Sequence, residues 1–255
     1  MKRLRQVALE FVLPAVLVAV WWFASSGSTS LYFPPLRDIL RAFADTWLAG
    51  GDLHVLGMTL STFAVGYGIA IVLGITAGVL LAANRVIADF LAPLLEFLRA
   101  LPAIALVPAF ISALGIDQRM RLSVVVFASV WPVLLNTIDG VRGVDTVVRD
   151  SAQVFRVPRL QRLLYVTLPG ASPQIFAGVR VGLALSLIAV IVTEMVVSAE
   201  GVGAFARAAQ YSFDLLAMWT AILLMGLVGY ILNKLFEVLE KRILRWHLQM
   251  RAVAT

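Results

Sequence analysis

The sequence contains no cysteine, and this absence excludes disulfides, cysteine-ligated zinc and iron–sulfur clusters. Its two histidines, His54 and His247, lie far apart in polar flanks, so we predict no metal site. The chain also lacks the G-x-x-x-x-G-K-[ST] loop that cradles the phosphates of ATP. No Ser/His/Asp or paired-carboxylate arrangement indicates an enzyme.

Charge is scarce as well. Only 14% of the 255 residues are charged and 61% are hydrophobic, and the mean hydropathy is +0.92. A soluble domain has about 25% charged residues, so lipid must be the main solvent of this chain. The net charge of +6 comes from basic residues that flank apolar segments. We therefore interpret these residues as setting the orientation of the spans in the membrane rather than as binding nucleic acid.

Apolar segments account for most of the chain, and a membrane-spanning helix needs about 20 such residues. The segments cover 7–25, 58–83, 90–115, 122–140, 174–198 and 215–236. We therefore predict an all-α integral membrane protein with about six transmembrane helices. The first segment has a basic start typical of a signal peptide, but its apolar run is as long as a full span, so we interpret it as one.

The third segment, 90–115, differs from the others because it contains Pro93, Pro102 and Pro108. Proline removes a backbone donor and kinks a helix, which is tolerated in a membrane where neighbouring helices satisfy the freed carbonyls. The sequence thus predicts a bent helix inside the bundle.

Lysine and arginine predict the orientation. With six spans and a cytoplasmic N-terminus, fourteen fall inside: Lys2, Arg3, Arg5, Arg85, Arg142, Arg149, Arg156, Arg159, Arg162, Lys234, Lys241, Arg242, Arg245 and Arg251. Five fall outside: Arg37, Arg41, Arg119, Arg121 and Arg207. Both termini are therefore expected in the cytoplasm, together with segment 141–173.

Small residues recur one helical turn apart in the second and fifth segments. They are Gly66, Ala70, Gly74, Gly78 and Ala82, followed by Gly178, Gly182 and Ser186. Such stripes let helix backbones approach closely in lipid, so we interpret them as packing surfaces rather than as a lining of the path.

Segment 141–173 is the longest polar, arginine-rich stretch. We predict two short helices within it, separated just before Pro158, because the residue before a proline is pushed out of the α region. Asp145 or Asp150 is suited to a helix N-terminal region. Ala152 and its neighbours are small, so a partner surface is expected to close over this helix. The alternative is a basic cytoplasmic loop without a partner.

This segment resembles the EAA loop of binding-protein-dependent ABC transporter permeases. That family has Glu-Ala-Ala, then three residues and a glycine, and later a Leu-Pro ending. Here Asp150-Ser151-Ala152-Gln153 is followed by Arg156 in place of the glycine and by Leu168-Pro169. A glycine would permit positive φ at a helix end, which arginine tolerates poorly; Pro158 is the alternative source of the break. Flanking stretches agree: Leu98-Arg99-Ala100-Leu101-Pro102, Leu106-Val107-Pro108, Gly178-Val179-Arg180, Thr193-Glu194-Met195 and Glu200-Gly201-Val202-Gly203.

The resemblance implies a type I (MetI-like) ABC importer permease in a bacterial inner membrane, with one domain over 1–255 and a core over 58–236. It implies separate ATPase subunits that use the ATP, a solute-binding protein outside and a second copy of the permease, with no cofactor in this chain. The nitrate, sulfonate and taurine subgroup suggests a small anion. The alternative is a secondary carrier or channel not driven by ATP. The residues expected to couple to the ATPase are Asp150, Ser151, Ala152, Gln153, Arg156, Leu168 and Pro169.

Ionisable residues within spans tend to face a bundle interior or a cavity. They are Glu96, Arg99, Asp139, Arg180 and Glu194. As candidates for the translocation path we name Asn136, Thr137, Arg180 and Glu194; structural pairing or snorkelling is the alternative for each. Arg180 and Glu194 stand about 21 Å apart on one helix, so they are not expected to pair.

Overall fold

The computed structural model describes residues 2–50, 53–197 and 200–245, and these ranges are helical without a strand. The helices are α1 (Lys2–Ser25), α2 (Leu36–Phe43), α3 (Leu53–Ala83), α4 (Arg85–Ala100), α5 (Val107–Leu114), α6 (Gln118–Arg142), α7 (Thr146–Val154), α8 (Arg159–Arg162), α9 (Leu168–Val197), α10 (Val202–Tyr211) and α11 (Leu215–Ile243). Two π-helical turns, Ala44–Ala49 and Leu163–Thr167, and a 3₁₀ turn, Ala103–Leu106, join some of them.

Within the described residues, four helices are long and apolar enough to cross a membrane. They are α3, α6, α11 and a 39-residue helix, Arg159–Val197, that joins α8 to α9 through the π turn. The pair α4 and α5 forms a fifth candidate, a span bent by 87°. The first expected span lies in α1, whose described apolar part, Val12–Ser25, is shorter than a span. The all-α membrane architecture is confirmed.

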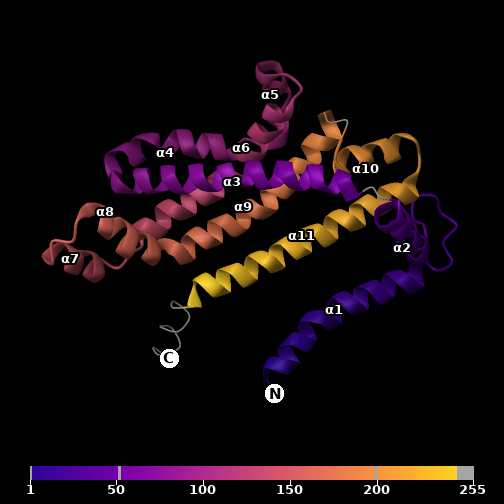
Figure 1. The fold of residues 1–255 in the computed structure, drawn as a ribbon, viewed down its shortest axis with the longest axis horizontal. Coiled ribbons are helices and arrows are strands. Elements are labelled where there is room, and N and C mark those ends of the chain that lie inside the picture. Colours follow the sequence, from indigo (N-terminus) through magenta and orange to yellow (C-terminus); the bar gives the residue numbers. More distant parts are fainter. Residues whose placement is uncertain (1, 51–52, 198–199, 246–255) are drawn as a thin grey trace.

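The centre of the subunit is a close packing of α3, α6 and α9, which run side by side in Figure 1. Glycines make this possible. Gly66 faces Val125, and Gly74 faces Val133 so closely that a Cβ there would lie 2.8 Å from the valine Cβ. On the other side of α6, Gly178 of α9 packs against the carbonyl oxygen of Pro132. The predicted stripes are therefore confirmed as helix-packing surfaces.

A small cap of helices covers the end of the bundle at which α3 begins. Here α2 packs on α11, and α10 packs on α9 and α11 (Figure 1). Trp47, in the π turn after α2, is fully buried; its Nε1 donates to Thr220 Oγ1 at 3.1 Å, and its ring meets Phe205 edge-on. An indole buried with its N–H satisfied anchors this cap on the bundle.

The broken span α4–α5 corrects one expectation. The bend is present, because Leu101 is extended (ψ 125°), Pro102 precedes the 3₁₀ turn, and Pro108 occupies the first turn of α5, where a missing N–H costs nothing. The prediction that this helix lies inside the bundle is wrong for the subunit. Of the residues of α4 only Ala88 is buried, and Phe90 and Phe97 are mostly exposed.

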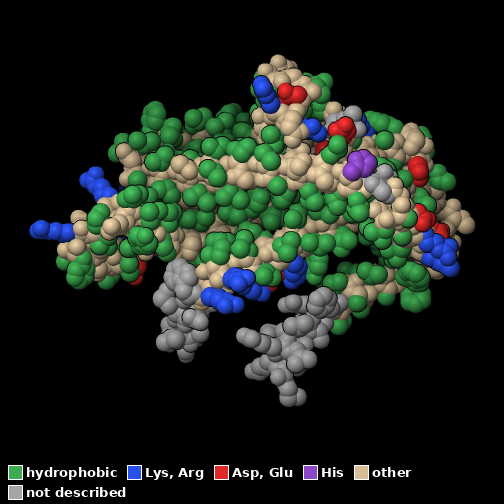
Figure 2. Space-filling view, in the orientation of Figure 1, with side chains coloured by type: hydrophobic (Ala, Val, Ile, Leu, Met, Phe, Trp, Pro, Cys, Tyr) green, Lys and Arg blue, Asp and Glu red, His purple; other side chains and the backbone are tan. Residues whose placement is uncertain are grey.

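The surface matches a protein that lies in lipid. Figure 2 shows hydrophobic side chains along the flank formed by the long helices, while blue lysine and arginine side chains gather at the ends and near the end of α11. In α11 these are Lys234, Lys241 and Arg242, of which the first two bond to Glu237.

Candidate coupling segment, buried carboxylate and membrane cavity

The segment between α6 and α9 forms the two short helices that were predicted, α7 and α8. Asp145 caps α7, and its Oδ1 accepts a hydrogen bond from the backbone N–H of Val147 at 2.7 Å. Arg149 Nη2 donates to the carbonyl oxygen of Val141 at 2.8 Å. This bond ties α7 to the last turn of α6, so the segment is held on the bundle at a defined angle.

The turn between α7 and α8 is built around Arg156, whose φ of +53° is left-handed. Its N–H bonds to the carbonyl of Gln153 at 2.9 Å, and the N–H of Val157 bonds to that of Ala152 at 3.0 Å. This pair of bonds is a Schellman motif, which normally places glycine at the left-handed position. Arginine thus adopts the conformation that the family glycine favours, and Pro158 does not replace it but precedes the first turn of α8.

The end of α7 exposes apolar side chains. Val154 is 79% exposed and Phe155 is 81% exposed. Asp150, Ser151 and Gln153 are also exposed. Ala152 is only 8% exposed, so it faces its own subunit, whereas we had expected a partner to close over it. Figure 1 places α7 and α8 at the end of the molecule opposite α10.

The closing Leu-Pro pair of the segment lies in the first turn of α9. Leu168 packs against the central core, and Pro169 is half-buried beside it. The proline does not begin a separate span, because the helix continues into α9 from the π turn. The segment and the span therefore form one continuous element.

Glu194 in α9 is fully buried and joins three elements. Its Oε2 accepts hydrogen bonds from Thr59 Oγ1 of α3 at 2.9 Å and from the N–H of Gly203 in α10 at 3.0 Å. Thr59 Oγ1 in turn accepts from the N–H of Val202 at 2.9 Å. Among the described residues, Oε1 has no hydrogen-bond partner.

Gly201 completes this cluster, because its φ of +106° and the adjoining carboxylate leave no room for a Cβ. Sequence reasoning identified Glu194 and the Glu-Gly-Val-Gly stretch but missed Thr59. A threonine 135 residues away in a glycine-rich helix gives no sequence signal of such a contact.

The other candidates for the path also have partners within the subunit. Arg180 lies 3.5 Å from Glu240 of α11. Asn136 donates to the carbonyl of Pro132 at 2.8 Å and accepts from Gln174 at 3.0 Å. Thr137 is buried, with its hydroxyl bonded to the carbonyl of Val133 at 2.6 Å. Each of these side chains thus has a structural contact within the subunit, and Arg180 and Glu194 bind different residues, as their spacing predicted.

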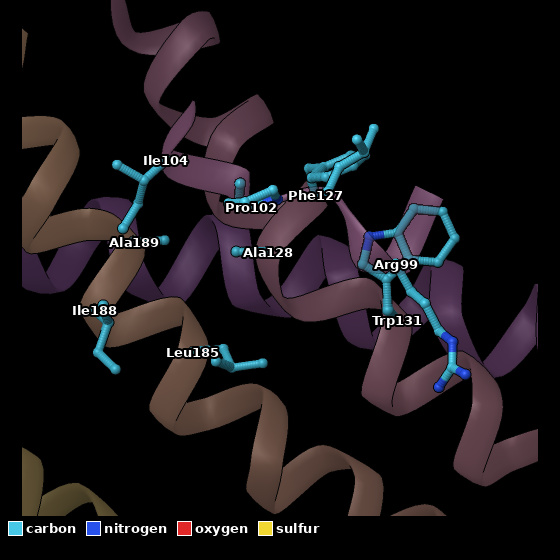
Figure 3. A pocket seen from close by; sticks show the side chains of 11 residues that line it. Arg99, Pro102, Ile104, Phe127, Ala128, Trp131, Leu185, Ile188 and Ala189 are labelled. Carbon is cyan, nitrogen blue, oxygen red and sulfur yellow. The ribbon is translucent and has the colours of Figure 1, made fainter. Parts of the chain in front are cut away.

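A cavity of about 250 Å³ lies where the α4–α5 break meets α6 and α9. Figure 3 shows its lining: Arg99 and Trp131 lie close together at one side, and Ile104, Ile188 and Ala189 lie at the other. Sequence reasoning named Arg99 as an ionisable residue within a span but missed Trp131, because nothing in the sequence distinguishes this indole from the other five.

The family model for the binding-protein-dependent transport system inner membrane component matches residues 70–245. The chain belongs to this family. The permease is 32% identical to the bicarbonate transport system permease protein CmpB of Synechococcus elongatus, over 96% of this chain and 94% of that protein. It is 30% identical to the nitrate import permease protein NrtB of Synechocystis sp., over 89% and 85%. It is 25% identical to the taurine transport system permease protein TauC of Escherichia coli, over 95% and 91%.

Solved structures agree on the fold. A chain of the methionine ABC transporter MetNI in an inward-facing conformation matches this permease with a TM-score of 0.64 at 17% identity, over 77% of this chain and 96% of that chain. A second crystal form gives a TM-score of 0.65. The MetI-like fold predicted from the resemblance is confirmed, and family membership favours an importer permease over a secondary carrier or channel.

Proposed function

We propose that this permease is the membrane-spanning subunit of an ATP-driven importer for a small anion, in the class of bicarbonate, nitrate, taurine and alkyl sulfonates. A solute-binding protein delivers the anion outside, separate ATPase subunits bind at segment 141–173 inside, and two copies of the permease enclose the path. The names of the relatives support the substrate class. The contacts of the coupling segment support the mode of action.

The observation that carries this proposal is the apolar end of α7. Val154 and Phe155 are the most exposed apolar side chains of α7 and the turn after it, and the exposed polar residues Asp150, Ser151 and Gln153 lie next to them in the chain. An exposed aromatic residue with a polar rim is typical of a protein–protein contact. Arg149 ties α7 to α6, Asp145 caps the start of α7, and α8 continues into α9. A displacement of the end of α7 would therefore be transmitted to the bundle. Such coupling would switch the helix bundle between two packed arrangements by rigid-body movement.

The decisive test replaces Phe155. Burying a phenylalanine at an interface contributes about 2 kcal/mol, so Phe155→Asp should weaken association with the ATPase by roughly thirtyfold or more. Phe155→Leu keeps an apolar surface and is the matched control. Each complex is purified through a tag on the ATPase, and co-purification and ATP-driven uptake of nitrate, bicarbonate and taurine are measured. Wild-type association of Phe155→Asp would contradict the assigned docking surface.

Two further readouts separate the parts of the proposal. Uptake that persists in vesicles depleted of ATP would favour a secondary carrier. Ala152→Asp is expected to reduce ATPase association too, but by disturbing α7 itself, because Ala152 is buried in its own subunit. Its monomeric protein should therefore show increased proteolysis within 141–173, whereas Phe155→Asp should not.

A further inference from the structure

The cavity beside the α4–α5 break is lined by two side chains, Arg99 and Trp131, whose donors have no partner among the described residues. Trp131 Nε1 is buried and bonds to no atom of the described residues. The Arg99 side chain, which also lines the cavity, has neither an ion pair nor a hydrogen bond within the described part of the chain. Figure 3 shows the indole beside the arginine side chain.

The buried indole N–H is costly in this position unless an acceptor binds it, whereas the Arg99 side chain is exposed at the edge of the cavity in the isolated subunit. A buried N–H without an acceptor loses the hydrogen bond it made to water. A guanidinium at membrane depth normally faces an aqueous cavity or pairs with an anion. Arginine also keeps its charge and presents a planar set of donors suited to oxyanions. An acceptor that carries negative charge would therefore satisfy both donors.

The remaining lining restricts the size and type of that acceptor. It is almost entirely apolar, with Phe127, Leu185 and Ile188 among its walls, and it contains no acidic residue. Small-molecule sites commonly combine apolar walls with a few fixed polar groups. The cavity lies at the break between α4 and α5, where this bent span meets α6 and α9.

We propose that this cavity binds the oxyanion group of a small solute that carries at most a short organic chain, with Arg99 supplying the charge and the Trp131 N–H a hydrogen bond. This assignment rests on the proposed anion import and names a binding position for the solute within the membrane. A free solute is favoured over a lipid headgroup because a cavity of about 250 Å³ suits a molecule of nitrate to butanesulfonate size.

The absence of cysteine allows a direct test in the complete transporter in nanodiscs. Ala128 lines the cavity, so Ala128→Cys places a thiol there. The rates at which this thiol reacts are compared for two methanethiosulfonate reagents, one with an anionic sulfonatoethyl group and one with a cationic trimethylammonioethyl group. We expect the anionic reagent to be favoured, and adding Arg99→Gln should lower the anionic-to-cationic rate ratio roughly tenfold or more, as removal of a nearby charge requires. Arg99→Lys should retain the preference.

Two controls distinguish the site from a general effect of charge. Thr29→Cys lies in an exposed loop, so its anionic-to-cationic rate ratio should not change when Arg99→Gln is added. In Ala128→Cys, 1-butanesulfonate, taurine or nitrate should slow labelling. Trp131→Phe, which keeps the ring and removes the N–H, should weaken this protection about tenfold, whereas Trp22→Phe on α1 should not.

The outcomes are separable. Protection by at least one of the three anions, lost in Arg99→Gln, supports the site even if ATP-driven uptake fails, in which case only the proposed function is wrong. Failure of both reagents to label Ala128→Cys overturns the proposal, because the cavity is then closed to solute. An unchanged rate ratio in Arg99→Gln overturns it too. Protection by phosphatidylglycerol but by none of the three anions would assign the cavity to lipid and overturn it as well.

Discussion

Replacing Gly78 by alanine adds one methyl group at the tightest point between α3 and α6. A Cβ there would lie 2.6 Å from Thr137 Cβ, 2.8 Å from Thr137 Cγ2 and 2.9 Å from the carbonyl oxygen of Leu134. Ordinary contacts begin near 3.4 Å, and the carbonyl belongs to a helix backbone, so the two helices must move apart. Forcing a methyl group into such a packed contact costs about 1–3 kcal/mol.

The same helix offers a matched control. Gly68 has nothing within 4 Å of its Cβ position, so Gly68→Ala gains helix propensity without a clash, about 0.5–1 kcal/mol. The two variants should therefore differ by about 3 kcal/mol, which corresponds to roughly 6–12 °C in Tm for a chain of this length.

The assay is thermal unfolding in mild detergent, followed by tryptophan fluorescence, with the monodisperse yield from size-exclusion chromatography. Gly74→Ala should behave like Gly78→Ala, because its Cβ would meet Val133 at 2.8 Å. If Gly78→Ala melts at or above the temperature of Gly68→Ala, the close α3–α6 packing is not the arrangement of the folded protein.

Three further predictions follow from the site. Arg156→Gly should stabilise the α7–α8 turn by about 1 kcal/mol and raise Tm, because glycine adopts positive φ without strain; a lower Tm would mean that the arginine side chain makes a stabilising contact. Glu194→Ala should destabilise the fold by about 2–3 kcal/mol in thermal unfolding, by leaving two donors unsatisfied, whereas Glu194→Gln keeps an acceptor oxygen and should melt near wild type; equal losses would refute the bridging role. Single cysteines at Thr29 and Ser212 should react with an impermeant thiol reagent in intact cells and one at Gln161 should not; labelling at Gln161 would overturn the orientation.

Features that depend on local sequence were predictable. The spacing of glycines in α3 and α9 predicted close helix packing, and Pro158 predicted where α8 begins. For the start of α7 the sequence offered Asp145 or Asp150, and the structure has Asp145 as the cap. Each is a short-range rule of backbone geometry or hydrogen bonding. The same rules predicted a bend in the third span from its prolines.

Features that depend on contacts between distant segments were not predictable. Thr59 and Glu194 are joined across 135 residues, and only the folded bundle brings them together. The burial of Ala152 likewise depends on how α7 lies against its own subunit. The position of α4 outside the bundle could not be read from its prolines, because a kink is compatible with either environment.

The unbroken helix Arg159–Val197 has a mechanical consequence. At 1.5 Å per residue, its 39 residues extend about 58 Å, from the coupling segment to the turn that holds Glu194. A tilt of about 5° around its midpoint would displace each end by roughly 2.5 Å in opposite directions, a distance comparable to one hydrogen bond. The carboxylate at the far end is bonded to α3 and α10, so those helices would have to follow or release it. A small rocking motion at the α8 end would thereby open or close contacts at the Glu194 end without any change in the length of the helix.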